Sequence, residues 1–159
     1  MIVKLTGIIL LALGSGCICA ERIGKGRKEI ELLYDLSGAL ESIEGIICWE
    51  KATLPQAIQR QITRKKCGGM FSMILNYVKS GDTLQNSWEK TFSELSSVSD
   101  ILCRIELFGD ETRITGQLHL AAQQLRKQAE RHSNERPEKE KLCVAVCSSV
   151  LGVLTILLF

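Results

Sequence analysis

Two glutamates and two histidines are the residues of this sequence whose types and spacing come nearest to chemistry. Glu41 and Glu44 stand three positions apart, about one helical turn, and paired carboxylates can carry out acid–base work. They flank an apolar stripe that implies no pocket, which favours a solvated or partner-facing edge. His119, one of the two histidines with His132, lies one residue past an apolar stripe, which favours a surface position over a general base or a phosphoacceptor.

The seven cysteines form no recognisable metal or disulfide pattern. Cys48, Cys67 and Cys103 are scattered through the polar part of the chain, without a C-x-x-C pair or a nearby histidine, and the other four lie in apolar ends. A zinc site needs four close nitrogen or sulfur ligands, and an odd total without framework spacing is typical of a reducing compartment. Gly24 and Gly26 lack the spacing of a phosphate loop. We therefore expect no catalytic residue, no cofactor and no metal site.

Trp88 can be read in two ways. Tryptophan is enriched at interaction hot spots, which suggests a partner. Its spacing of four from both Leu84 and Phe92 is typical of an apolar helix face, which favours burial in a core. The sequence therefore offers three candidate partner-binding residues: Glu41, Glu44 and Trp88.

The elements that must position these residues are one polar domain and two apolar ends. Residues 1–20 contain one charged side chain, Lys4, and residues 142–159 contain none. A helix of about 20 apolar residues crosses a bilayer, so both ends are predicted to be transmembrane helices around a domain at 21–141. A net charge of +2 is too weak to indicate nucleic acid as a partner.

Basic residues border both apolar ends on the side of the middle domain. They are Arg22, Lys25, Arg27 and Lys28 after the first end, and Arg131, Arg136, Lys139 and Lys141 before the second. By the positive-inside rule, the domain at 21–141 is predicted to be cytoplasmic. An alternative stays open for the first end, because Lys4, an apolar run and small residues up to Ala20 also describe a cleavable signal peptide.

Apolar spacing in the middle domain predicts an all-α fold, an antiparallel bundle of about five to six helices. The predicted helices span about 27–50, 54–66, 70–79, 84–95, 101–108 and 111–130. The first and last carry the longest apolar stripes and are expected to pair antiparallel, which would bring the two spans side by side. No alternation typical of a strand is longer than a few residues.

Boundary residues support these limits. Thr53 and Asp100 are expected to cap helix starts, since their side chains can accept a backbone N–H, and Asp82-Thr83 is expected to open a further helix. The run Cys67-Gly68-Gly69 is expected to break the chain between two helices, and Gly24 with Gly26 to loosen the junction with the first span. Around Pro137 the sequence leaves open a solvated helix, kinked at the proline, or a short linker.

Several short segments also occur in an order known from one family. They are Leu40-Glu41-Ser42-Ile43-Glu44-Gly45-Ile46, Thr53-Leu54-Pro55-Gln56-Ala57, Ser80-Gly81 followed by Trp88, Leu107-Phe108-Gly109, and a long helix with Gln117 and His119. With an apolar segment at each end, this set resembles the stage III sporulation protein AB family of endospore-forming bacteria. The resemblance covers nearly the whole chain.

The resemblance implies a role and no reaction. The family is similar to the cytoplasmic domains of F-type platform proteins of type II secretion systems and type IV pili. It implies a membrane component of the mother cell–forespore channel complex, in the mother-cell membrane around the forespore, with a retained N-terminal span. The implied partners are a cytoplasmic secretion-type ATPase similar to stage III sporulation protein AA, other membrane proteins of the complex and membrane lipid, with no small-molecule substrate.

Two other functions stay open. The chain could be a membrane-bound helical signalling protein that uses His119, or a secreted, tail-anchored helical protein cleaved after Ala20. Under the favoured interpretation, Glu41 and Glu44 would offer a carboxylate edge to basic residues of the ATPase.

Overall fold

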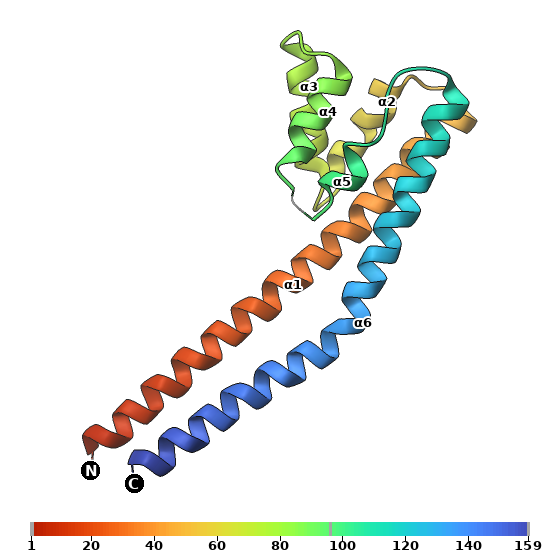
Figure 1. Ribbon diagram of the computed structural model, residues 1–159. Coiled ribbons are helices and arrows are strands. Elements are labelled where there is room, and N and C mark those ends of the chain that lie inside the picture. Colours follow the sequence, from red (N-terminus) through yellow and green to blue (C-terminus); the bar gives the residue numbers. More distant parts are fainter. Residues whose placement is uncertain (1, 96, 159) are drawn as a thin grey trace. The chain divides into compact units, whose positions relative to one another are not determined.

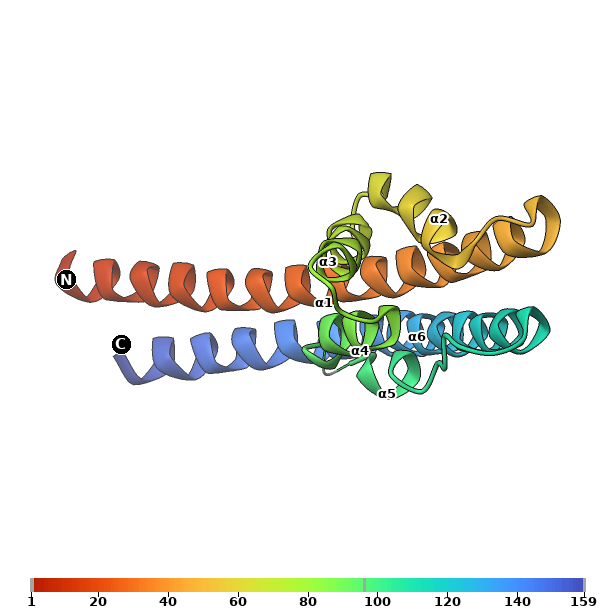
Figure 2. The ribbon, with the colours of Figure 1, turned by 90° about the horizontal axis from the view of Figure 1, so that it is seen from above.

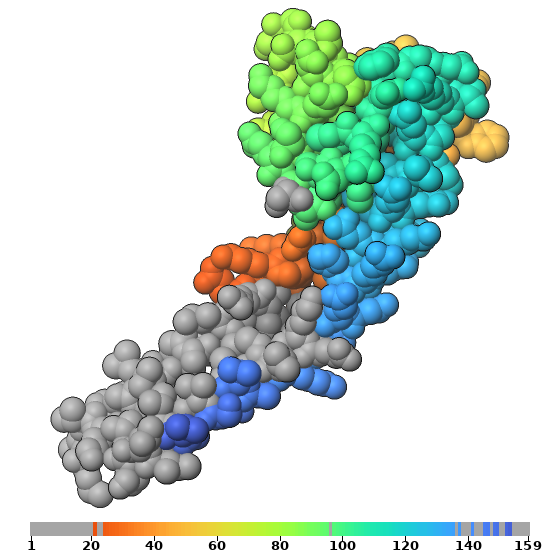
Figure 3. Space-filling view, viewed as in Figure 1, coloured from red at the N-terminus to blue at the C-terminus, as the bar shows by residue number. Residues whose placement is uncertain are grey.

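The computed structural model describes the backbone of residues 2–95 and 97–158. It describes the side chains of residues 21, 24–95, 97–135, 137, 141, 145–146, 148–149 and 152–153 (Figure 3). The chain divides into two compact units, one made of Met1–Ile30 with Arg131–Phe159 and the other of Glu31–Glu130.

The elements follow one another along the chain as labelled in Figure 1. They are α1 (Ile2–Glu50), α2 (Leu54–Gln59), the 3-10 helix η1 (Arg60–Thr63), α3 (Gly68–Lys79), α4 (Leu84–Ser93), α5 (Ser99–Leu102) and α6 (Glu111–Leu158). The described backbone contains helices and turns and no strand, so the all-α prediction is confirmed.

The core of the unit Glu31–Glu130 lies where the apolar stripes of α1 and α6 meet. All five stripe residues of α1 are at most 7% exposed: Leu33, Leu36, Leu40, Ile43 and Ile47. Ser37 Oγ donates to the carbonyl of Ala122 at 3.0 Å, and Lys51 Nζ donates to Glu111 Oε1 at 2.7 Å. Because residue numbers rise along α1 as they fall along α6, the two helices are antiparallel in this unit, as predicted.

Three aromatic rings from α3 and α4 form a second part of the core. Phe71, Trp88 and Phe92 are fully buried, with ring centroids 4.7 Å apart for Trp88 and Phe92 and 6.2 Å apart for the other two pairs. Tilted and edge-on contacts of this kind are the favoured arrangements of aromatic rings. In Figure 2, α2 and α3 lie on the α1 side of this unit, and α4 and α5 lie on the α6 side.

Thr83 caps α4 with its side chain, whereas Thr53 precedes α2 without a side-chain cap hydrogen bond. Thr83 Oγ1 accepts from the backbone N–H of Asn86 at 3.3 Å, and Gln56 Oε1 accepts from the N–H of Thr53 at 3.1 Å. Both threonines have extended backbones, typical of the residue before a helix.

The predicted helix at 101–108 is wrong, because α5 ends at Leu102 and is preceded by Val98 in place of Asp100. Side chains of neighbouring helices bind backbone N–H groups that would be bonded within the helix if α5 were longer. The N–H of Glu106 donates to Gln117 Oε1 at 2.7 Å, and that of Leu107 donates to Gln85 Oε1 at 2.8 Å. These contacts hold the segment in a non-helical path and satisfy its donors.

The predicted break at Cys67-Gly68-Gly69 is also misplaced, because α3 begins at Gly68 and both glycines are helical. A Cβ on Gly68 would lie 2.2 Å from the carbonyl oxygen of Ile62, so glycine here permits close backbone contact with η1. The predicted helix at 54–66 is shorter, because α2 ends at Gln59 and gives way to η1.

Both long helices continue past the points where interruptions were predicted. Backbone of α1 is helical through Gly24 and Gly26, where Lys25 forms an i,i+4 ion pair with Glu21 at 2.8 Å. Helix α6 continues through Pro137, which excludes the short linker.

The predicted spans, 1–20 and 142–159, fall mostly on residues whose side chains lie outside the described ones. Within the residues that the structure does describe, no helix combines the length and the apolar character needed to cross a membrane.

Candidate functional site

The part of α1 at residues 31–50 is an acidic segment, with five carboxylates and no lysine or arginine. Each carboxylate has a basic partner from another element: Glu31 with Lys66 at 2.6 Å, Asp35 with Arg64 at 3.2 Å, Glu41 with Arg126 at 3.7 Å, Glu44 with His119 at 3.0 Å, and Glu50 with Arg60 at 2.5 Å. Basic residues therefore oppose the negative charge of the acidic segment on two flanks, with residues 60–66 on one and α6 on the other.

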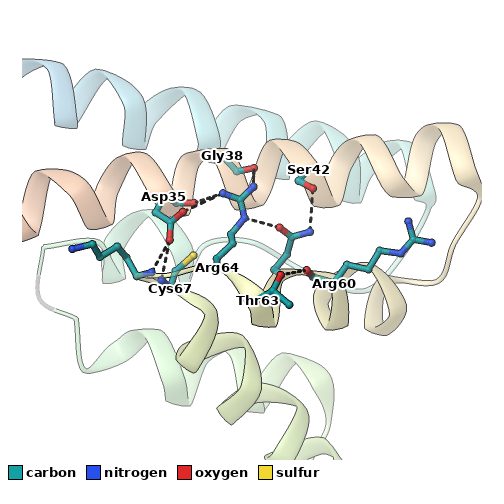
Figure 4. A network of polar contacts seen from close by, with 9 residues as sticks. Asp35, Gly38, Ser42, Arg60, Thr63, Arg64 and Cys67 are labelled. Atoms are coloured by element: carbon teal, nitrogen blue, oxygen red, sulfur yellow. Dashed lines mark hydrogen bonds and ion pairs between the residues drawn. The ribbon is translucent and has the colours of Figure 1, made fainter.

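Asp35 and Arg64 form the centre of a polar network on the first flank (Figure 4). Asp35 Oδ2 accepts from the backbone N–H groups of Lys66 at 3.0 Å and Cys67 at 3.1 Å, next to the start of α3. Arg64 donates to Asp35 Oδ1 at 3.2 Å and to the carbonyl of Gly38 at 2.7 Å. We call these residues the Asp35–Arg64 clamp, since they join α1 to the start of α3.

The clamp also sets the protonation of its members. Burial by itself raises the pKa of the Asp35 carboxyl, but hydrogen bonds from Cys67, Lys66 and Arg64 outweigh it, and the pKa is lowered from 3.8. Burial and the neighbouring Asp35 carboxylate raise the pKa of the Cys67 thiol to about 12. Burial, with the carboxylates of Glu89 and Asp100, raises the pKa of Cys103. Neither thiol is therefore activated as a nucleophile.

On the other flank, Glu44 and His119 meet at the α1–α6 edge. His119 Nε2 lies 2.9 Å from the amide nitrogen of Gln123, which can only donate, so Nε2 accepts and Nδ1–H donates to Glu44 Oε2 at 3.0 Å. Both ring nitrogens thus have partners. The predicted surface position of His119 is confirmed, because its side chain is 54% exposed.

Glu41 lies on the same edge but is held more loosely. Its nearest oxygen is 3.7 Å from Arg126 Nη1, and the side chains are 46% and 60% exposed. An ion pair this open to solvent is worth about 0–1 kcal/mol, so it can separate at small cost. Glu41 and Glu44 therefore lie on one edge, each opposite a basic residue of α6, and their binding of a partner stays a prediction.

The two tryptophans have opposite environments. Trp88 is fully buried and its Nε1–H donates to the carbonyl of Leu102 at 2.9 Å, so it is a core residue here, and its role in partner binding stays a prediction. Trp49, near the end of α1, is 88% exposed. Sequence reasoning missed Trp49, although position 49 falls outside the 3-4 spacing that continues through Ile43 and Ile47.

A shallow depression of about 500 Å³ lies on the surface beside the acidic segment. It is lined by Ser42, Ile46, Glu50, Arg60, Gln61, Thr63 and Arg64. Gln61 Nε2 donates to Ser42 Oγ at 3.1 Å and Arg60 pairs with Glu50, so its polar groups already bind one another. No group of three or more His, Cys, Asp or Glu side chains in the described part of the chain is arranged to hold a metal ion.

Comparison with known proteins adds one finding. The family model described as stage III sporulation protein AB matches residues 4–159, nearly the whole chain. No curated protein and no solved structure matches.

Proposed function

We propose that this chain, which belongs to the stage III sporulation protein AB family, links a cytoplasmic ATPase to the membrane. Membership of the family implies a role in stage III of sporulation. In this proposal it is a non-enzymatic component of the channel complex between the mother cell and the forespore. Its ATPase partner is of the secretion type, and its other partners are membrane proteins of the same complex.

The observation that carries the proposal is the acidic segment of α1. Residues 31–50 carry five carboxylates and no lysine or arginine, and Glu41 at the α1–α6 edge pairs only loosely with Arg126. A basic residue of the ATPase can take the place of Arg126 at small cost, because exposed ion pairs are weak. Complementary charge of this kind chiefly contributes specificity and a faster association rate.

The continuous helices support the membrane part of the proposal. We expect residues 1–20 and 142–159 to be transmembrane helices, and helical backbone continues from both ranges into the unit Glu31–Glu130. In the proposal, α1 and α6 are the two elements through which the bound ATPase is connected to the bilayer.

The test measures binding of the purified ATPase of the same complex to the full chain in detergent micelles. Glu41→Lys with Glu44→Lys should weaken binding about tenfold or more, with a larger effect at low salt, because attraction becomes repulsion. Arg126→Ala should leave binding equal or tighter, because it removes the internal competitor for Glu41.

The matched control applies the same change of charge to α4 and the residue that follows it. Glu89 and Glu94 are exposed, so Glu89→Lys with Glu94→Lys should leave ATPase binding within about twofold. Thermal melting of each variant confirms that it is folded. Unchanged ATPase binding in the Glu41/Glu44 variant would remove this edge from the proposal, and no binding of the wild-type chain would remove the ATPase.

A further inference from the structure

Two stretches of the long helices carry an excess of positive charge, residues 21–30 of α1 and residues 131–141 of α6. Together they contain eight lysines and arginines against five glutamates, whereas residues 31–130 contain 11 basic and 13 acidic residues. Both stretches belong to the same compact unit, Met1–Ile30 with Arg131–Phe159. We call residues 21–30 and 131–141 the basic stem.

Several cations of the basic stem are not neutralised by a carboxylate. Four of them have exposed side chains and form no ion pair with any residue that the structure describes: Arg27, Lys28, Arg131 and Lys141. Lys25 differs, because it pairs with Glu21 at 2.8 Å. A Cβ on Gly24 or Gly26 would meet nothing within 4 Å, so open space lies beside this part of α1. The positive charge of the basic stem is therefore open to an anion from outside.

The distance of these cations from the apolar ends follows from helix geometry. An α-helix rises about 1.5 Å per residue, so Arg27 and Lys28 lie about 10–12 Å along α1 from Ala20. Lys141 directly precedes the second apolar end, and Arg131 lies about 15 Å further along α6. The headgroup layer of a bilayer is roughly 5–8 Å thick on each side, and the field of an anionic surface extends about 8–10 Å beyond it. If residues 1–20 and 142–159 are spans, all four cations lie within the headgroups or their field.

Charge and position together indicate the occupant. An excess of three positive charges is too small for nucleic acid, which calls for a strongly basic surface. Clusters of lysine and arginine next to a membrane span attract anionic lipid, and their long side chains can reach the headgroups. Residues 31–130, with their excess of acidic residues, offer no such attraction. The charges therefore favour an anionic lipid at the basic stem.

We infer that the basic stem binds the phosphate headgroups of anionic phospholipids through Arg27, Lys28, Arg131 and Lys141. The inference rests on the membrane part of the proposed function and does not depend on the ATPase. Because the cations come from both α1 and α6, bound headgroups would hold the two helices at one depth in the bilayer.

The first experiment titrates the full chain in neutral detergent micelles with lipids that carry a fluorophore in one tail, and anisotropy reports binding. Phosphatidylglycerol should bind about tenfold tighter than phosphatidylcholine with the same tails, because only the first carries a net negative charge. Raising the salt to about 0.5 M should reduce this preference to about twofold, since salt screens exposed charges. Arg27→Gln, Lys28→Gln, Arg131→Gln and Lys141→Gln combined should abolish the preference.

A control with the same change of net charge comes from the other unit. Lys65, Lys79, Arg104 and Lys127 are also exposed and without an ion pair among the described residues. Their combined change to glutamine should leave the affinity for phosphatidylglycerol within about twofold. Thermal melting confirms that both variants are folded. Equal loss of affinity in the two variants, or no loss in the basic-stem variant, overturns the inference.

Competition separates a lipid from other anions. Glycerol phosphate has the same phosphate chemistry without tails, and polyglutamate represents an acidic protein. Neither should displace phosphatidylglycerol at an equal concentration of negative charge. Displacement by glycerol phosphate would indicate a site for soluble phosphate, displacement by polyglutamate would indicate an acidic protein partner, and either result overturns the inference.

Extraction of the chain from phosphatidylcholine vesicles with alkaline carbonate distinguishes failure of this inference from failure of the proposed spans. If the chain stays in the vesicles and yet shows no preference for phosphatidylglycerol in micelles, the inference is overturned and the proposed spans stand. If carbonate releases the chain, the spans and the inference both fail.

Discussion

Asp35 shows how a single carboxylate organises two elements of this protein. Its side chain lies on α1, yet it accepts hydrogen bonds from the N–H groups of Lys66 and Cys67, just before α3, and from Arg64. Donors at the start of a helix have no partner within the helix, so an acceptor from elsewhere stabilises them. Hydrogen bonds to a charged group are about twice as strong as those between neutral groups.

We predict that Asp35→Asn lowers the free energy of unfolding by about 2 kcal/mol at pH 7, because it removes the charge and points an amide donor at other donors. The effect should depend on pH. The pKa of Asp35 is lower in the folded chain than its ordinary value of 3.8, so its stabilisation is present above that value and is lost as pH falls through the folded pKa. Thermal melting between about pH 7 and pH 3 should therefore show the difference between wild type and variant shrinking toward acid.

Asp82 provides the control for this measurement. Its carboxylate lies 3.8 Å from Lys90 Nζ and its side chain is 44% exposed, so Asp82→Asn should change stability by less than about 0.5 kcal/mol. A constant difference between wild type and Asp35→Asn across the whole pH range would contradict the role assigned to the charge of Asp35.

The elements are shaped by contacts that the local sequence does not show. Gly68 and Gly69 are adjacent and chemically identical, but a Cβ on the first would meet the backbone of η1, and a Cβ on the second would meet nothing within 4 Å. Only the first glycine is therefore required by packing. The second is free to change, and alanine there restricts the unfolded chain.

We predict that Gly68→Ala destabilises the protein by about 2–3 kcal/mol, because η1 and α3 must move apart to admit the methyl group. Gly69→Ala should leave the free energy of unfolding unchanged or raise it by up to about 1 kcal/mol, so the melting temperature should be equal or slightly higher. Thermal melting of the two single variants, made side by side, checks both. Similar destabilisation by the two substitutions would mean that the close approach of Ile62 to Gly68 is not the reason for glycine.

At the scale of the whole molecule, the proposed function fixes the side of the membrane on which the unit Glu31–Glu130 lies. Under the proposed function, that unit is cytoplasmic and the first span is retained. The turn at 80–82 is exposed and connects α3 to α4, so it can accept an inserted epitope with little effect on the core.

We predict that an epitope inserted in the turn at 80–82 is protected from antibody in intact sporulating cells and accessible after lysis. The intact mass of the purified chain should include residues 1–20. Detection of the epitope from outside unbroken cells would reverse the topology. A mass that lacks residues 1–20 would favour the cleaved, secreted alternative instead. Cys67 is a poor labelling site for this purpose, because it is buried and the pKa of its thiol is about 12.

Much of the architecture could be predicted from the sequence, because it depends on neighbours along the chain. The 3-4 spacing of Leu33 through Ile47 defines one face of a helix wherever that helix goes, and Thr83, before α4, caps that helix locally. The same periodicity indicated that α1 and α6 pair, since each needs a partner to bury its stripe.

The remaining features were decided by tertiary structure alone, because each depends on contacts between residues far apart in the sequence. The clamp joins Asp35 to Arg64, 29 positions away, and the path after α5 depends on Gln85 and Gln117, 22 and 11 positions from the groups they bind. Burial of Trp88 and exposure of Trp49 likewise depend on what packs against each helix. Local spacing determines which face of a helix is apolar, but only the packed fold determines which surfaces stay open to a partner.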